Sequence, residues 1–366
     1  MNRFIDIAAP GIAGLTPYVP GKPISELERE LGISHSVKLA SNENPLGASP
    51  KVAEAIGRAM QDLARYPDGG GYDLRFALGA KHGIDPGRIT LGNGSNDVLD
   101  MIARVFLRPG DESLFSQYAF AVYPISSQAA GAKLVVAPAR DYGHDLNALQ
   151  AHISDRTRVI WIANPNNPTG TWLEADELKA FIATVPQNVI VVVDEAYSEY
   201  VAQKAYPDAS QWLGDFPNLI VTRTFSKTYG LAALRVGYGI SHPDVAELLN
   251  RVRQPFNVNS FAQVGALAAL EDQAFIQSSV GANLAGMAQL IEGFEALDLG
   301  YIPSVGNFVT VELDRSGVEV DQVLLREGCI ARPVANYGMP NHLRVTVGLP
   351  EENRRFLDAL KKVLER

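Results

Sequence analysis

The chain has 366 residues, 46% of them hydrophobic and 20% charged, which is typical of a globular protein. Its net charge of −9 excludes an overall positive field for nucleic acid or an anionic membrane surface, so an anionic ligand needs local arginines. The single cysteine, Cys329, excludes an intrachain disulfide and a cysteine-rich metal site.

The sequence gives no sign of a membrane segment or a secretion signal. No stretch approaches the ~18 uninterrupted apolar residues of a membrane-spanning helix. Residues 1–20 lack a basic segment followed by a long apolar run, so no signal peptide is expected. The lone cysteine suits a reducing compartment, and we expect a cytoplasmic protein.

The first part of the chain is expected to be irregular and then helical. Residues 1–45 are rich in proline and glycine, with one short helix predicted at 24–31 and Ser25 as its candidate N-cap. Segment 41–47, Ser-Asn-Glu-Asn-Pro-Leu-Gly, is expected to be a polar loop. Helical periodicity then predicts helices at 51–63 and 72–82.

From residue 88 onward, strands are expected to alternate with helices. The predicted strands cover 88–92, 113–116, 133–137, 158–163, 189–193, 219–222 and 236–240, and the helices 97–106, 123–130 and 173–184. The run 189–193 is apolar throughout, as expected of a strand that is buried on both faces. The alternation predicts an α/β domain with a mostly parallel sheet between helices.

The C-terminal part follows a different pattern. It is expected to be helical through about 244–297, with strands at 308–313 and 343–347 and a last helix at 353–364. A chain longer than ~250–300 residues usually forms two domains. We therefore expect a large domain, 41–264, beside a small α+β domain formed by 1–40 and 265–366.

Polar residues follow three of the predicted strands. Ligands of such sheets lie outside the carboxyl ends of the strands, so this rule places 164–170, Asp194 and Ser226-Lys227 at one rim. In an apolar cleft the pKa of Lys227 would fall, and its free amine would become a nucleophile for a carbonyl carbon. Asp194 ends an apolar strand, where a carboxylate is costly unless it meets a cation.

A candidate anion site lies at the turn 92–96. Gly94-Ser95-Asn96 opens a predicted helix directly after a strand, where free N–H groups and the helix dipole favour an anion. Arg235, eight residues after Lys227, could add a bidentate fork. A glycine-rich turn alone is weak evidence.

Taken together, Asn164-Pro-Asn-Asn-Pro-Thr-Gly170, Asp194, Tyr197 and Ser226-Lys227 resemble, in order and spacing, the aminotransferase superfamily of pyridoxal-phosphate enzymes. The resemblance covers nearly the whole chain and implies the aspartate aminotransferase fold type, with a seven-stranded sheet and pyridoxal 5'-phosphate as the cofactor. It implies that Lys227 attaches the cofactor covalently and then acts as the general base. Asp194 would keep the pyridine nitrogen protonated, and Tyr197 and Asn167 would hydrogen-bond the 3' oxygen of the ring.

The same resemblance implies the remaining cofactor contacts. The phosphate would be held by Gly94, Ser95, Asn96, Thr224, Ser226 and Arg235. Tyr66 would reach the phosphate from a neighbouring subunit, which implies a homodimer with shared active sites. Phe120 is the preferred residue to stack on the cofactor ring, and Tyr118 is the alternative.

Within the superfamily, the chain is most similar to the histidinol-phosphate aminotransferases. The similarity rests on Leu-Thr-Pro-Tyr-Val-Pro-Gly-Lys-Pro at 15–23, the loop 41–47, Arg332-Pro333 and Asn-His-Leu-Arg-Val-Thr-Val-Gly at 341–348. It implies transamination between histidinol phosphate and 2-oxoglutarate in histidine biosynthesis. The implied substrate residues are Tyr18, Asn44, Asn167, Arg332 and Arg344, with Asn307 at the edge of the site. Arg344 would hold the α-carboxylate of glutamate, and Arg332 would help to hold the phosphate of the substrate.

Three other activities stay open. Aromatic aminotransferases share nearly all of these motifs, and threonine-phosphate decarboxylases use the same scaffold on another phosphorylated substrate. A catalytically silent, pyridoxal-phosphate-binding regulator is the third, but the intact Lys227, Asp194, Tyr197 and Arg235 argue against it. No nucleic acid, membrane or metal partner is expected.

Overall fold

We describe the fold from a computed structural model that covers residues 3–18 and 20–365; Val19, in the motif 15–23, lies outside the described residues. The chain begins with α1 (Ile24–Leu31), β1 (Val37–Lys38), α2 (Pro50–Ala59) and α3 (Tyr72–His82). Ser49 caps α2 by accepting a hydrogen bond from the Lys51 amide, and Pro50 occupies the first turn. The predicted cap Ser25 is wrong: it lies inside α1, which begins after Pro23.

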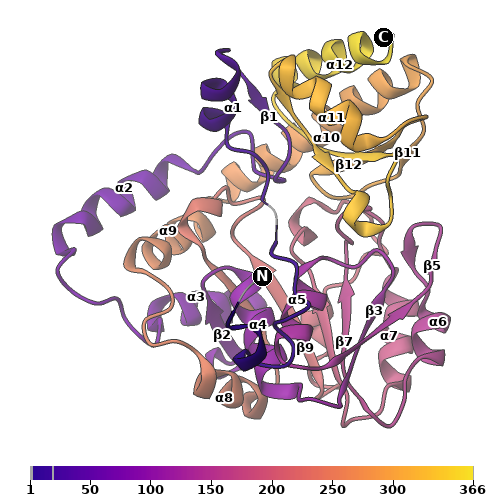
Figure 1. The fold of residues 1–366 in the computed structure, drawn as a ribbon. Helices are drawn as coiled ribbons and strands as arrows, with labels where there is room; N and C mark the ends of the chain where they lie inside the picture. Colours follow the sequence, from indigo (N-terminus) through magenta and orange to yellow (C-terminus); the bar gives the residue numbers. More distant parts are fainter. Residues whose placement is uncertain (1–2, 19, 366) are drawn as a thin grey trace.

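A seven-stranded sheet forms the centre of the larger part of the molecule (Figure 1). Its strands are β2 (Ile89–Gly92), β3 (Glu112–Ser116), β4 (Lys133–Ala137), β7 (Thr157–Ala163), β8 (Ile190–Asp194), β9 (Leu219–Thr224) and β10 (Gly237–Ile240). They lie in the order β2-β10-β9-β8-β7-β3-β4, and β10 runs antiparallel to both of its neighbours. The predicted mostly parallel, seven-stranded sheet is therefore confirmed.

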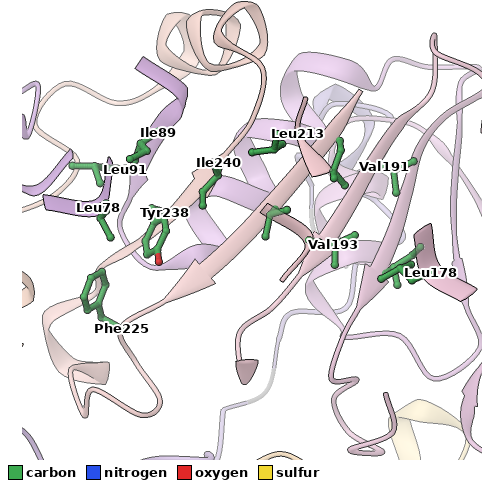
Figure 2. Close-up of a cluster of buried hydrophobic side chains, with 14 of the residues drawn as sticks. Leu78, Ile89, Leu91, Leu178, Val191, Val193, Leu213, Phe225, Tyr238 and Ile240 are labelled. Atoms are coloured by element: carbon green, nitrogen blue, oxygen red, sulfur yellow. The ribbon is translucent and has the colours of Figure 1, made fainter. Parts of the chain in front are cut away.

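Helices cover both faces of this sheet. They are α4 (Ser95–Phe106), α5 (Val122–Ala129), α6 (Leu146–Ala151), α7 (Ala175–Thr184), α8 (Pro243–Val252) and α9 (Ser260–Leu270), with a small hairpin of β5 (Ala139–Arg140) and β6 (Gly143–His144). Along β8, Val191 and Val193 belong to one buried cluster, part of which Figure 2 shows, and Ile190 and Val192 belong to another on the opposite face. This double burial explains why the strand is apolar throughout.

A second, antiparallel sheet lies with the C-terminal helices at the other end of the molecule (Figure 1). It comprises β11 (Tyr301–Ile302), β12 (Phe308–Glu312), β15 (His342–Thr346) and β14 (Arg332–Pro333), with α10 (Gln273–Ala296), α11 (Gly317–Arg326) and α12 (Pro350–Leu364) nearby. A separate apolar cluster fills this region. β1 pairs with β13 (Cys329–Ile330), which joins the N-terminal segment to the C-terminal part. The boundaries of the two domains stay a prediction.

Most of the elements that the sequence missed are short. They are β1, β5, β6, β11, β13, β14 and α6, together with the 3-10 turns at Ile5–Ile7, Met60–Asp62, Pro86–Arg88, Ser198–Tyr200, Ala209–Trp212, Ala232–Leu234 and Ala335–Tyr337. The ten-residue helix α11 was also missed. A two-residue strand has no measurable period, so only its pairing partner defines it. Within the described residues, no helix is long and apolar enough to cross a membrane.

The sheet places three strand ends side by side. Ala163 at the end of β7 pairs with Asp194 at the end of β8, and Asp194 pairs with Thr222 near the end of β9. The loops that follow these strands therefore leave the sheet at one rim, as predicted for parallel strands.

Candidate active site

The rim encloses a cavity of about 230 Å³. Its lining joins loops of the large sheet to the N-terminal segment and to β15. The predicted site residues among the lining are Tyr18, Ser95, Asn96, Phe120, Asn167, Asp194, Tyr197, Thr224, Ser226, Lys227, Arg235 and Arg344. Most of the residues selected from sequence therefore meet in one cavity.

Asp194 lies buried in the floor of this cavity. One carboxylate oxygen accepts a hydrogen bond from the Tyr123 hydroxyl at 2.8 Å and the other from the Thr222 hydroxyl at 3.0 Å. Burial raises the pKa of Asp194, and these two hydrogen bonds oppose the shift. Both donors are neutral, so the carboxylate can still gain from a cationic N–H in the cavity.

Lys227 extends from the loop after β9 into the same cavity. Its Nζ donates a hydrogen bond to the Ser41 carbonyl at 3.1 Å and lies 5.5 Å from the centre of the Tyr197 ring. Burial, and then the nearby charge of Arg344, lower the pKa of Lys227 to about 7. Near neutral pH a substantial fraction of this amine is unprotonated, which a nucleophile or a general base requires.

Tyr197 lies three residues after Asp194, and its hydroxyl accepts a hydrogen bond from the Asn42 side chain at 2.9 Å. Burial raises the pKa of the phenol to about 12, so it stays protonated. Its ring packs edge-on against Phe308 at 5.2 Å. The hydroxyl therefore keeps its own proton to donate to an oxygen in the cavity.

Arg344, on β15, is a buried cation in the lining of the cavity. Its guanidinium donates to the Asn167 side chain and to the Ala40 carbonyl, both at 2.6 Å. Its Nε has no hydrogen-bond partner among the described residues. A buried guanidinium that is held only by neutral acceptors favours an anionic ligand.

A cradle for a phosphate surrounds the start of α4. Gly94, with φ +82°, precedes the helix, and a Cβ there would lie 2.5 Å from Nη2 of Arg235. A side chain would therefore displace the guanidinium, which explains the glycine. Ser95 and Asn96 in the first turn, together with Thr224, Ser226 and Arg235, surround the space. Helix N–H groups, hydroxyls and a guanidinium fit a phosphate.

Comparisons with known proteins agree with this geometry. Residues 34–360 match the family described as aminotransferase class I and II. The chain belongs to the class I and II aminotransferases. It is 58% identical to histidinol-phosphate aminotransferase 2 of Pseudomonas fluorescens, covering 99% of both proteins, and 57% identical to that of Pseudomonas aeruginosa, covering 100% of this chain and 99% of that protein. The crystal structure of histidinol-phosphate aminotransferase from Sinorhizobium meliloti in complex with pyridoxal-5'-phosphate has a TM-score of 0.90 at 30% identity, covering 100% of this chain and 98% of that one.

Four predicted residues of this aminotransferase lie outside the cavity lining: Gly94, described above, and Asn44, Tyr66 and Arg332. The Asn44 amide donates to the Thr228 carbonyl at 2.8 Å and to the Ser279 hydroxyl at 2.9 Å, which favours a role in holding the loop after Lys227. Tyr66 is 81% exposed and stacks on Phe256. Arg332 lines an adjoining cavity, and its guanidinium lies 5.6 Å from the centre of the Tyr18 ring.

The structure also distinguishes between Phe120 and Tyr118, the two candidates for stacking on the cofactor ring. Phe120 lines the cavity, whereas Tyr118 packs against Tyr142 at 5.6 Å. Asn307 is buried and donates to the Asn42 carbonyl at 3.0 Å, so it braces the loop 41–47 rather than the cavity itself. Its position in the cavity lining therefore favours Phe120 over Tyr118 for stacking on the ring.

Sequence reasoning missed the neutral partners of the charged residues. Asn42, Tyr123 and Thr222 each hydrogen-bond a predicted catalytic side chain, but none was selected for that role. Asn42 has φ +54°, a conformation that Asn tolerates better than most residues. In the sequence, only an asparagine within a loop of turn-forming residues indicates this conformation. Tyr123 and Thr222 follow no local pattern, because their role depends on packing between elements.

Proposed function

We propose that this aminotransferase exchanges an amino group between histidinol phosphate and 2-oxoglutarate, with pyridoxal 5'-phosphate as its cofactor, in histidine biosynthesis. The observation that carries the proposal is the full-length identity of 58% to a histidinol-phosphate aminotransferase. The site supports it, because a buried lysine, a carboxylate and an arginine share one cavity with a phosphate cradle. The cofactor supplies an electron sink for the carbon from which a proton is removed.

Four residues fit the reactive part of that cofactor. Lys227 is positioned to attach it covalently and, once released, to accept the proton of the substrate Cα at Nζ. The Asp194 carboxylate would hold a proton at the ring nitrogen, because a buried anion stabilises a cationic N–H. Tyr197 and Asn167 supply a hydroxyl and an amide for the 3' oxygen of the ring.

The phosphate of the cofactor fits the cradle at α4. We assign its binding to Gly94, Ser95, Asn96, Thr224, Ser226 and Arg235, and the stacking of the ring to Phe120. The Gly94 position supports this assignment, since it leaves room for Arg235 beside the first turn. Such a cradle orients the cofactor without taking part in proton transfer.

The substrate anions are assigned to two arginines. Arg344 is buried and Asn167 accepts one of its hydrogen bonds, which fixes the guanidinium in the cavity. Arg332 faces Arg344 across the β14–β15 pair, and Tyr18 lies between the two cavities. We propose that Arg344 binds the α-carboxylate of glutamate, that Arg332 contributes to phosphate binding, and that Tyr18 covers the substrate.

We further propose a cytoplasmic homodimer in which Tyr66 reaches the phosphate of the partner's cofactor. The exposed Tyr66 has Met60, Leu63, Tyr72 and Phe76 as exposed apolar neighbours in sequence, and a second copy would bury them. Mixing a Lys227→Ala chain with a Tyr66→Phe chain tests whether Tyr66 contributes to the active site of the partner. If it does, one site of the heterodimer carries both changes and the other is intact. Heterodimer activity no better than the average of the two homodimers contradicts the shared site.

Cell fractionation tests the cytoplasmic location.

A substrate panel tests the activity. The measurement is kcat/KM for histidinol phosphate, histidinol, phenylalanine and tyrosine, each with 2-oxoglutarate. We expect histidinol phosphate to be preferred, and histidinol to be poor because it lacks the anion that the arginines bind. If phenylalanine or tyrosine exceeds histidinol phosphate, the protein is an aromatic aminotransferase and the proposal fails.

A further inference from the structure

Tyr123 lines the active-site cavity beside Asp194. Its side chain is fully buried, and its hydroxyl donates a hydrogen bond to Oδ2 of Asp194 at 2.8 Å. Burial, and then the charge of Asp194, raise the pKa of the phenol well above its usual range, so the hydroxyl keeps its proton. Tyr123 therefore always acts as a donor to the carboxylate that the proposed function places at the ring nitrogen of the cofactor.

Packing between the sheet and α5 fixes the direction of this hydroxyl. The Tyr123 ring, in the first turn of α5, stacks on Trp161 of β7, with ring centres 5.2 Å apart and planes at 9°. Nε1 of Trp161 donates to the hydroxyl of Ser113 on β3 at 2.8 Å, and Ser113 hydrogen-bonds Ser127 of α5 at 2.7 Å. The phenol can turn away from Asp194 only if this stack breaks.

A second neutral donor serves the other oxygen of Asp194. The hydroxyl of Thr222, on β9, donates to Oδ1 at 3.0 Å. The backbone of Ala196 also donates to the carboxylate, and the charge of Lys227 acts on it less than these hydrogen bonds do. The ionised form of Asp194 therefore depends mainly on neutral donors that the fold holds in place.

A buried acid and base can place the proton that they share on either partner. With the proton on the ring nitrogen, a cationic N–H faces an ionised carboxylate, and with the proton on Asp194 both partners are neutral. Burial favours the neutral pair, because each charge must leave water. Hydrogen bonds to the carboxylate favour the charged pair, because they are stronger when the acceptor is ionised. The two forms contain the same number of protons, so the surroundings of the carboxylate decide between them.

We propose that Tyr123 and Thr222 are positioning residues that keep the shared proton on the ring nitrogen of the cofactor and not on Asp194. Both hydroxyls act through the carboxylate, so neither has to touch the reacting carbon. The inference rests on the proposed function, because it requires pyridoxal phosphate with its ring nitrogen at Asp194. It deepens that function by naming the groups that make Asp194 an effective anion, since a neutral ring is a weaker electron sink.

The test measures the protonation of the ring nitrogen directly. The holoenzyme is reconstituted with pyridoxal phosphate whose ring nitrogen is isotopically labelled, and nitrogen NMR distinguishes a protonated from an unprotonated ring. Tyr123→Phe and Thr222→Val each remove one hydroxyl with little change of shape. Thr222→Ser keeps the hydroxyl at its position, and Tyr238→Phe is the matched control, because it removes a buried hydroxyl that contacts His82 instead.

We expect each lost hydroxyl to shift the ratio of the charged to the neutral pair by roughly tenfold or more toward the neutral pair. This is the usual effect of one hydrogen bond to a charged group. The double variant Tyr123→Phe with Thr222→Val should move the resonance furthest toward that of a neutral pyridine. The kcat should fall in the same order, while the KM for glutamate changes less, since neither hydroxyl is assigned a substrate anion. Thr222→Ser and Tyr238→Phe should follow the wild type.

The outcomes separate this inference from the proposed function, because the NMR measurement needs no substrate. A ring nitrogen that is protonated in the wild type and equally protonated in the folded double variant overturns the inference and leaves the proposed function standing. A wild type whose ring nitrogen is unprotonated overturns the inference together with the role given to Asp194. If Tyr123→Phe does not fold, Thr222→Val against Thr222→Ser gives the same decision, because only the first loses the hydroxyl.

Discussion

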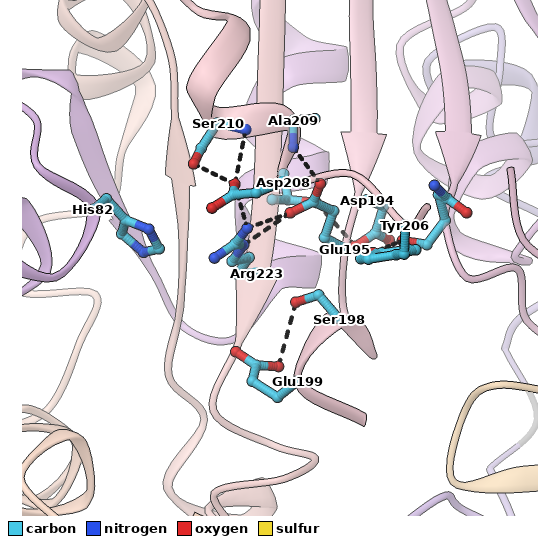
Figure 3. Close-up of polar contacts among 12 residues, drawn as sticks. His82, Asp194, Glu195, Ser198, Glu199, Tyr206, Asp208, Ala209, Ser210 and Arg223 are labelled. Carbon is cyan, nitrogen blue, oxygen red and sulfur yellow. Dashed lines mark hydrogen bonds and ion pairs between the residues drawn. The ribbon is translucent and has the colours of Figure 1, made fainter. Parts of the chain in front are cut away.

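Two adjacent carboxylates, Asp194 and Glu195, are buried at the end of β8 but have opposite surroundings. Glu195 accepts hydrogen bonds from Nε and Nη2 of Arg223 at 2.9 and 2.6 Å, and Arg223 also pairs with Asp208 at 2.7 Å (Figure 3). Asp194 instead accepts hydrogen bonds from the hydroxyls of Tyr123 and Thr222. The partners also follow one another along the neighbouring strand β9: Thr222 donates a hydrogen bond to Asp194, and the next residue, Arg223, donates to Glu195.

The difference shows how one pair of strands supplies both chemistry and stability. Successive side chains of a strand point to opposite faces, so a shift of one residue moves a carboxylate from the site to the structural network. Glu195 is neutralised within the chain, which leaves it no free charge for a ligand. The side-chain hydrogen bonds of Asp194 come from neutral hydroxyls, so its charge is available to the cofactor.

The largest expected effect comes from breaking the structural pair. Arg223→Met should leave Glu195 buried without its cation and lower the free energy of unfolding by ~3–5 kcal/mol, measured by chemical denaturation. The double variant Arg223→Met with Glu195→Leu is the control, and it should recover most of the loss. A single variant that costs less than ~1 kcal/mol would contradict the role assigned to this pair.

The opposite result is expected at Asp194. Asp194→Ala should lower kcat by ~10²–10³-fold, the usual cost of removing one preorganised electrostatic group. Its stability should change little or rise, because a carboxylate without an ionic partner no longer has to be desolvated. If the variant unfolds easily but keeps its kcat, the two carboxylates have the reverse roles.

The pKa of Lys227 predicts a pH dependence for cofactor attachment. Because burial lowers this pKa to about 7, the reactive amine is depleted below pH 7 and predominates above it. The rate of covalent attachment of pyridoxal phosphate to the cofactor-free protein should rise ~tenfold per pH unit below 7 and level off above it. The measurement is absorbance after mixing. Lys227→Ala should show no such phase, and the exposed Lys51→Ala should match wild type.

Much of the large domain could be read from sequence because its strands are buried on both faces. The run 189–193 contains only apolar residues, and its strand was located to within one residue as Ile190–Asp194. The small sheet was harder, since Tyr301–Ile302 and Arg332–Pro333 are too short to show a period and exist only through pairing. In the site, charged residues were found from their types and spacing. Their partners Tyr123 and Thr222, and the exclusion of Asn44 from the lining, depend on packing between distant segments.

The smallest effect is expected at Tyr197, and it shows how much the Tyr197 hydroxyl contributes to the rate in comparison with the Asp194 carboxylate. Tyr197→Phe removes one hydroxyl and leaves the Asn42 amide without its acceptor. A single hydrogen bond contributes ~0.5–1.5 kcal/mol net, so kcat/KM should fall by roughly threefold to tenfold. Steady-state kinetics beside Asp194→Ala provide the comparison.

A second measurement separates the catalytic role of Tyr197 from a packing role. If the hydroxyl serves the 3' oxygen of the cofactor, Tyr197→Phe should shift the pH titration of the cofactor absorbance while stability stays within ~1 kcal/mol of wild type. Asn42→Ala, which removes the other partner, should shift the same titration less, because the phenol itself remains. An absorbance titration that Tyr197→Phe leaves unchanged would mean that the hydroxyl only braces Asn42. Equal rate losses for Tyr197→Phe and Asp194→Ala would mean that the ring nitrogen is not the main target of the buried charge.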